Sequence, residues 1–323
     1  DKTPPTTPSN VDLVGGGYSR LGGVSFSWPT VTETGSGFNH YNLKIFDQKN
    51  TFISEVQQSG VSYTTTLDSG GAYYLAVSGV DNALLEGDVA RSGLVCVDNE
   101  KPLVPDRFWP HSGQAVGDYV WSNSPTNTWY WTKPVDKGGS GINHYEVQIN
   151  GGSTISINSS NLYVLDLISR TNGAIVNATF KTFDNAGNES ELYTSSQTLK
   201  IDTVPPVIFV GLIAQAWNAN DLTQEIYSLV PQNTARKLVF QWAKDKITDT
   251  GGSGVAKVEY YWGPEAGRLT GIEIPTQTNR VTPDNQFPEK GETIYFFKLR
   301  AQDWAGNWSP MTTLHSAYFD AFS

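Results

Sequence analysis

Apolar and polar residues alternate along most of the chain in short runs. Examples are VSFSW (24–28), YNLKIF (41–46), YEVQI (145–149) and KLVFQW (237–242), each bounded by Gly, Pro, Asn, Asp or Ser. Alternation over a few residues is typical of β-strands that bury one face, and the bounding residues are typical of turns. Only NDLTQEIYSLV (220–230) has a helical spacing, and it is short. The pattern predicts an all-β protein.

The same order of motifs occurs three times. Each copy begins with an Asp followed four residues later by a Pro: DKTPP at 1, DNEKP at 98 and DTVPP at 202. A strand with a Trp follows (Trp28, Trp131 or Trp242), and then a Gly-Ser-Gly turn and a strand with a Tyr. Late in each copy stands VDNALLEG (80–87), FDNAGNES (183–190) or QDWAGNWS (302–309). A fixed order at an interval of about 100 residues indicates tandem repeats the size of a β-sandwich.

This order of Pro-Pro start, strand-B Trp, strand-C Tyr and Asp-x-Ala-Gly-Asn-x-Ser resembles the bacterial, Ig-like form of the fibronectin type III domain. The resemblance covers the whole chain and implies three tandem fibronectin type III-like β-sandwich domains in an end-to-end rod. The expected domains are 1–97, 98–201 and 202–323, the third with a longer A–B insertion. Asp-x-Ala-Gly-Asn is then the turn between strands F and G, and the first repeat departs from it, since DNALLEG lacks Ala-Gly-Asn.

Charge and composition narrow the possible partners. The 32 acidic and 22 basic residues give a net charge of −10, and no Lys/Arg cluster could neutralise phosphates, so we expect no nucleic-acid partner. No apolar run approaches the roughly 20 residues that cross a bilayer, so no membrane insertion is expected within this chain. The single cysteine, Cys96, cannot form an internal disulfide. This favours an extracellular or cell-surface protein of a prokaryote over a disulfide-rich animal ectodomain.

Catalytic motifs are not evident. The sequence has no G-x-S-x-G elbow, no Cys/His metal-ligand spacing and no phosphate loop. His40 and His144 fall at the same position of their repeats and are expected to be strand residues, whereas His111 and His315 are isolated. Spacing alone does not exclude a carboxylate pair for glycoside hydrolysis. Because recurring motifs are typical of architecture, we predict that the chain is not an enzyme.

Acidic residues recur in the linker, the B–C loop and the F–G loop of each repeat, and the resemblance brings these three loops together at one end of each sandwich. Converging carboxylates are the ligands that Ca²⁺ prefers, and without a cation they repel one another. The alternative is that each Asp forms a turn by bonding its own backbone. The candidate Ca²⁺ ligands at the domain junctions are Asp98, Asp136, Asp184, Asp202, Asp249 and Asp303, with Asp1, Glu33 and Asp81 as their counterparts in the first repeat and Asp245 as an alternative to Asp249.

Seven of the ten tryptophans lie outside the repeated core position, all in the second and third repeats. Exposed aromatic side chains mark interaction sites and can stack on sugar rings. The alternative is that they pack at the junction of these repeats or beneath the insertion, since Trp is usually highly buried. The candidate glycan-binding residues are Trp304, Trp308, Trp262, Trp109 and Trp121.

Three functions are compatible with these features. The first is a non-catalytic structural or adhesive region of a cell-surface adhesin, appendage or surface coat. Its partner would be a cell-surface glycan or protein, or copies of the chain itself. The second is a glycan-binding module that uses exposed tryptophans, and the third is an accessory spacer of a secreted glycoside hydrolase. Burial of the tryptophans separates the first from the second. A catalytic domain encoded beside this segment would reveal the third.

Overall fold

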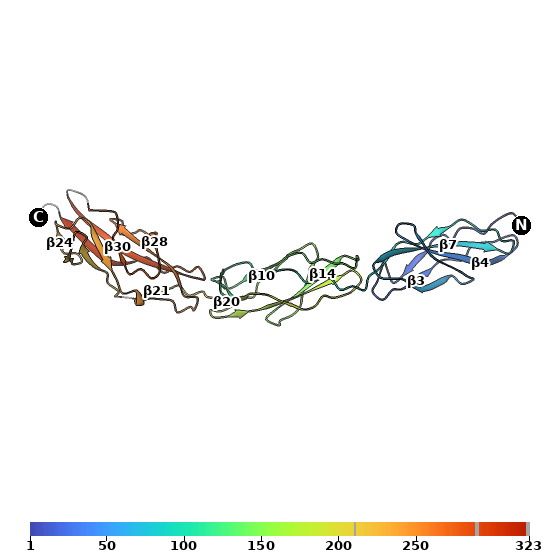
Figure 1. The fold of residues 1–323 in the computed structure, drawn as a ribbon, viewed down its shortest axis with the longest axis horizontal. Coiled ribbons are helices and arrows are strands. Elements are labelled where there is room, and N and C mark those ends of the chain that lie inside the picture. Colours follow the sequence, from blue (N-terminus) through green and yellow to red (C-terminus); the bar gives the residue numbers. More distant parts are fainter. Residues whose placement is uncertain (210, 288–290, 321–323) are drawn as a thin grey trace. The chain divides into compact units, whose positions relative to one another are not determined.

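The computed structural model describes residues 1–209, 211–287 and 291–320. In this part of the chain every regular element is a β-strand except one turn of 3-10 helix, η1 (Lys244–Lys246) (Figure 1). None of these residues forms a helix with the length and apolarity that a membrane crossing needs. The predicted all-β class is confirmed.

Two compact units make up the chain: 1–108 with 130–164 and 178–195, and 109–129 with 165–177 and 196–323. Among the described residues, both strands of every hydrogen-bonded pair lie within 1–97, within 98–201 or within 202–320. The domain boundaries at these two positions, and the end-to-end arrangement, stay predictions.

The first unit begins with a complete sandwich. One sheet has the order β1-β3-β6, and the other has the order β2-β9-β7-β4-β5 with β8 on β7. Trp28 and Tyr41 meet edge to face between the sheets, with ring centroids 5.5 Å apart. The strands are β1 (Asp12–Val14), β2 (Tyr18–Ser19), β3 (Gly23–Ser27), β4 (Phe38–Asp47), β5 (Phe52–Gln58), β6 (Ser62–Thr66), β7 (Gly71–Asp81), β8 (Ala90–Arg91) and β9 (Val95–Val97).

The remaining strands of the first unit repeat this design. An antiparallel sheet has the order β15-β14-β18-β19, and the Trp131 ring packs on Tyr145 at 5.5 Å and on Phe180 at 5.1 Å. These strands are β14 (Ile142–Ile149), β15 (Ile155–Asn158), β18 (Ala178–Asp184) and β19 (Tyr193–Thr194). The second repeat also has a sheet of order β10-β13-β16, only part of which belongs to the first unit; its strands are β10 (Phe108–Pro110), β13 (Asn127–Trp131) and β16 (Tyr163–Asp166).

The second unit contains a sheet of order β11-β12-β20-β17 and the sheets of the third repeat, of order β23-β22-β25-β29, β24-β31-β30-β27-β28 and β21-β26. Phe240 stacks on Phe297 at 4.1 Å in the core of the third repeat, which also contains Trp242 and Trp262. The strands are β11 (Gln114–Val116), β12 (Tyr119–Ser122), β17 (Ile175–Val176), β20 (Thr198–Ile201), β21 (Val207–Ile208), β22 (Gln215–Asn218), β23 (Asp221–Ile226), β24 (Pro231–Gln232), β25 (Leu238–Gln241), β26 (Ile247–Thr248), β27 (Val255–Gly263), β28 (Ile272–Ile274), β29 (Arg280–Val281), β30 (Glu292–Asp303) and β31 (Thr312–Asp320).

The helical spacing over 220–230 is misleading. Residues Asp221–Ile226 form β23, which pairs antiparallel with β22 in register Ala216↔Ile226. The pairing satisfies the backbone of this stretch through a neighbouring strand, and a short helix would lack such tertiary support. The segment before β25 therefore contains a hairpin of β22 and β23, and no helix.

Candidate metal centres

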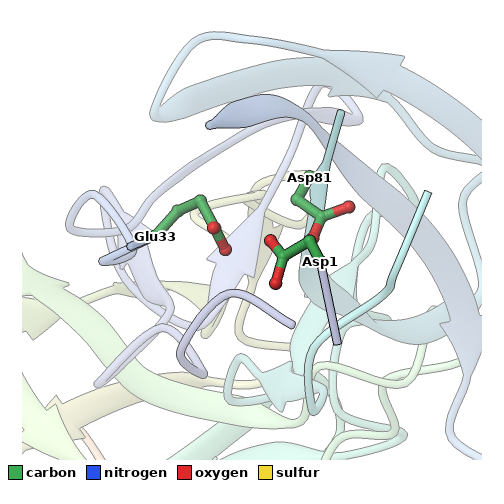
Figure 2. A group of neighbouring side chains, drawn as sticks. All are labelled: Asp1, Glu33 and Asp81. Carbon is green, nitrogen blue, oxygen red and sulfur yellow. The ribbon is translucent and has the colours of Figure 1, made fainter. Parts of the chain in front are cut away.

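Acidic side chains gather three times in the described residues, in the combinations that the sequence predicted. We name them the first triad (Asp1, Glu33, Asp81), the second triad (Asp98, Asp136, Asp184) and the third triad (Asp202, Asp249, Asp303). Within each triad, carboxylate oxygens of the three residues lie within 4.8 Å of one another. Figure 2 shows the carboxylate groups of the first triad around a common space. Asp245, the alternative to Asp249, is not among them.

The linker Asp of each triad ties the start of a repeat to its B–C loop. Asp98 Oδ1 accepts the amide of Glu100 at 3.0 Å, and Oδ2 accepts the amide of Ser140 at 3.0 Å. The same two bonds form at Asp202, to Val204 and Ser253, and at Asp1, to Thr3 and Ser36. Asp98 and Asp202 are 0 % exposed, and Asp1 is exposed. In each repeat, one carboxylate therefore accepts an amide of its own linker turn and an amide of the B–C loop, and so connects these two segments.

A glycine makes room for this carboxylate in every repeat. A Cβ at Gly138 would lie 1.7 Å from Asp98 Oδ1, and a Cβ at Gly251 would lie 1.8 Å from Asp202 Oδ1. A Cβ at Gly35 would lie 1.9 Å from Asp1 Oδ2. Non-bonded heavy atoms cannot approach so closely. The B–C loop therefore needs a glycine at this position, because the linker carboxylate lies directly against its backbone.

The B–C acid shapes the loop around itself. Asp136 accepts the amides of Gly138 at 3.1 Å and Gly141 at 2.6 Å. Asp249 accepts the amides of Gly251 and Gly254 in the same way. This is the turn-forming role that the sequence left open. It does not exclude cation binding, because each carboxylate oxygen has two lone pairs and an amide occupies only one.

The F–G motif closes each triad in the second and third repeats. Asp184 accepts the backbone amide of Asn188 at Oδ1 and its side-chain amide at Oδ2, both at 2.8 Å. The same Asn188 side chain donates to the backbone carbonyl of Asp98 at 2.9 Å. Asn307 makes the equivalent bonds to Asp303 and to the Asp202 carbonyl. Asp-x-Ala-Gly-Asn is therefore a turn, as predicted, and also a clamp on the linker, which sequence reasoning missed.

Repeat one lacks this clamp. Leu85 stands where the other repeats have Asn188 and Asn307, and only its backbone amide reaches Asp81 Oδ1, at 2.8 Å. Asp81 Oδ2 and Glu33 Oε2 are both buried atoms without a hydrogen-bond partner. Asp81 itself is 0 % exposed. The missing Ala-Gly-Asn in the sequence was the signal for this difference.

Negative charge accumulates at the triads. None of the nine carboxylates pairs with a Lys, Arg or His within the described ranges. Two ionised carboxylates 4.8 Å apart repel by about 3–4 kcal/mol at an effective dielectric constant of about 20. Burial raises the pKa of Asp303 above its usual value, and the negative charge of Asp202 adds to the increase. Half-buried Cys96 has a raised pKa through burial and through the charges of the second triad.

None of the five candidate glycan-binding tryptophans is exposed. Trp262 is 3 % exposed, because the ring completes the core of the third repeat and its Nε1 donates to the backbone carbonyl of Asn285; part of it also lines a cavity beside Tyr261 and Arg268. The other four are half-buried: Trp109, Trp121, Trp304 and Trp308.

Packing contacts account for three of these four. The Arg300 guanidinium lies 3.9 Å from the Trp308 ring centroid. Trp121 and Trp304 lie against the B–C loop of the third repeat, 3.8 Å and 3.7 Å from where a Cβ on Gly252 and Gly254 would stand. These positions favour the packing alternative over a stacking platform for sugars.

No protein-family model matches the chain, and no curated protein matches it. The chain is similar to the crystal structure of the FN1-FN3 domains of chicken CNTN1, with 15% identity, 98% of this chain and 100% of that chain covered, and a TM-score of 0.39. It is also similar to a two fibronectin type III domain segment of chicken tenascin, with 15% identity, coverage of 61% and 99%, and a TM-score of 0.28.

Proposed function

We propose that the chain is a non-catalytic structural or adhesive region of a prokaryotic cell-surface protein, and that Ca²⁺ bound at the acidic triads holds each sandwich to the segment preceding it. One observation carries the proposal. The same three carboxylates, one from the linker, one from the B–C loop and one from the F–G turn, gather within 4.8 Å in all three repeats. An ion at this place cross-links three segments that are far apart in sequence.

The chemistry of the triads suits Ca²⁺ better than other common metals. All side-chain ligands are carboxylate oxygens, which favours hard cations over Zn²⁺. The three carboxylates leave further positions for backbone carbonyls and water, and Ca²⁺ accepts six to eight ligands in irregular geometry, whereas Mg²⁺ requires a near-ideal octahedron. Extracellular Ca²⁺ modules bind in the range of about 0.1–1 mM, so sites of moderate affinity suffice outside the cell.

A structural role is also supported by the histidines, the residues that enzymes most often use for proton transfer. His144 stacks on Phe183 with ring centroids 4.6 Å apart, and His40 bonds to Asn39 and Asn42. His315 is 4 % exposed, and burial lowers its pKa. These three side chains serve packing or local hydrogen bonding in the geometry described.

Glycan binding has one observation in its favour. A cavity of about 370 Å³ in the third repeat is lined by aromatic and polar side chains, among them Tyr261, Arg268 and Asp284. Pockets with this mixture of side chains are typical of small-molecule sites. Binding on a glycan array that is lost in Tyr261→Ala would support this second function, and an array without signal would remove it.

The test of the main proposal is a melt of the full chain by differential scanning calorimetry, in excess EGTA and in millimolar CaCl₂, with MgCl₂ as the control. An ion that binds only the folded form stabilises it by RT ln(1 + [Ca²⁺]/Kd), which is about 1.4 kcal/mol at a tenfold excess over its Kd. We expect transitions to rise with Ca²⁺ and to respond less in the Asp303→Asn variant. Identical melts in EGTA and Ca²⁺ would refute the calcium role. Reproducible turnover of a hydrolase substrate would refute the structural role.

A further inference from the structure

We propose that the first triad is the tightest Ca²⁺ site of the chain, because a cation there takes the place that an asparagine amide occupies in the other two repeats. This inference rests on the proposed function and ranks its three sites. It predicts that Asp1, Glu33 and Asp81 bind Ca²⁺ more tightly than either of the other triads.

The second and third triads contain an internal substitute for a cation. Asn307 Nδ2 donates to Asp303 Oδ2 at 2.7 Å and to the Asp202 carbonyl at 2.8 Å. The NH₂ group is the positive end of the amide dipole, so it offsets part of the negative charge and fixes the linker without an ion. A Ca²⁺ that binds Asp303 through Oδ2 must displace or share this donor, which lowers its net affinity.

The first triad has no such donor. The Leu85 side chain carries no polar hydrogen and only its backbone amide reaches Asp81 Oδ1, so Asp81 Oδ2 is buried and unpartnered. Glu33 Oε2 is likewise buried and has no hydrogen-bond partner. A cation that coordinates such an oxygen replaces no hydrogen bond, so its binding there offsets the desolvation of the carboxylate without a loss in exchange. Both orphaned oxygens belong to carboxylates that meet around one space (Figure 2).

The composition of the first triad also favours Ca²⁺ over the smaller Mg²⁺. It replaces the Asp of the other B–C loops by Glu33, whose side chain is one methylene longer and reaches the site from the side opposite Asp81 (Figure 2). Asp1 is exposed, so water has access to complete the coordination shell. A longer carboxylate with open access accommodates the irregular, partly hydrated shell of Ca²⁺.

Calorimetric titration of the full chain with CaCl₂ tests the inference. The chain is prepared with a Gly-Ser dipeptide before Asp1, which moves the charged amino group away from the triad. We expect one site with a Kd at least about tenfold below the others, which is a difference of about 1.4 kcal/mol. Leu85→Asn restores the missing amide and should weaken this site by about tenfold or more. Leu84→Asn places the same residue one position earlier, outside the triad, and should leave the Kd unchanged.

Two further variants separate the inference from the proposed function. Asp81→Asn should abolish the tight site, and Asp303→Asn should remove only a weak one. A tight site that survives Asp81→Asn and disappears with Asp303→Asn would overturn the ranking while leaving calcium binding intact. Absence of any heat at millimolar Ca²⁺ would overturn both. In ¹⁵N–¹H spectra, shifts of the Gly35, Ser36 and Leu85 amides at the lowest Ca²⁺ additions identify the first triad even if a variant folds poorly.

Discussion

The Asn188→Ala substitution isolates the contribution of the F–G clamp. Asn188 is 1 % exposed, and its side-chain amide donates to the Asp98 carbonyl at 2.9 Å and to Asp184 Oδ2 at 2.8 Å. A neutral hydrogen bond contributes about 1 kcal/mol, and a bond to a charged acceptor contributes about 1.5–3 kcal/mol. Loss of both should therefore reduce the free energy of unfolding by about 2–4 kcal/mol.

The expected change is large enough to see in a calorimetric melt. For a sandwich of about 100 residues, 1 kcal/mol shifts Tm by about 4–8 °C, so one transition should fall by on the order of 10–20 °C in EGTA. Transitions of the other sandwiches should stay in place. Addition of Ca²⁺ should recover more stability in the variant than in the parent, because the ion no longer competes with the amide.

Asn143→Ala is the matched control. Asn143 is exposed, donates to Asn185 Oδ1 at 3.0 Å and bonds His144 Nδ1 through its Oδ1 at 2.8 Å, in the same part of the second repeat. Loss of these two exposed hydrogen bonds should cost less than about 1 kcal/mol. If Asn188→Ala melts within a degree or two of Asn143→Ala in EGTA, the clamp contributes no more than an ordinary surface bond and the reasoning above is refuted.

Three further predictions follow from the same geometry. Gly251→Ala places a methyl group against the Asp202 carboxylate and should lower the Tm of the third sandwich, whereas Gly267→Ala, where a Cβ meets nothing within 4 Å, should not. Leu84 has φ of 65° where the other repeats have Gly187 and Gly306, so Leu84→Gly should relieve strain and stabilise the first sandwich by about 1 kcal/mol in a urea titration. Without Ca²⁺, the raised pKa of Asp303 means that the folded state binds more protons than the unfolded state between the usual value of 3.8 and the folded pKa. Stability of the third sandwich should therefore fall as pH rises through this window, and Asp303→Asn should remove that slope in melts at several pH values.

Much of the fold could be predicted because the three repeats are independent instances of one pattern. A single Asp-x-Ala-Gly-Asn is only a turn signal, but its fixed order with the linker Asp and the B–C acid predicted which carboxylates meet. Trp28, Trp131 and Trp242 are buried as predicted, at 4 %, 2 % and 3 % exposure, because strand alternation places them on the inner face.

The errors concern features that depend on neighbours rather than on local pattern. Residues 220–230 have the spacing of a helix, but the adjacent β22 edge provides hydrogen bonds that only a strand can use. Trp262 lies in a strand pattern much like those of the half-buried tryptophans, so the sequence does not show that its ring faces the core. The bond from Asn188 to the Asp98 carbonyl spans 90 residues and has no local signature.

The clamp explains why the motif recurs. A turn between two strands needs only an Asp to accept the returning amide and a glycine at positive φ, as at Gly187 with φ of 87°. It does not need an Asn that reaches the linker, nor a linker Asp that fills the space above a glycine. These extra parts act on the segment before the sandwich, so the motif fixes how the chain begins each repeat. Repeat one keeps the linker Asp, the glycine and both other acids but lacks the Asn, and it is there that two carboxylate oxygens are left buried without a partner. The Asn side-chain amide and a bound cation are then two ways to offset the negative charge of an acidic triad. The Leu85→Asn substitution introduces the amide in repeat one and therefore tests both.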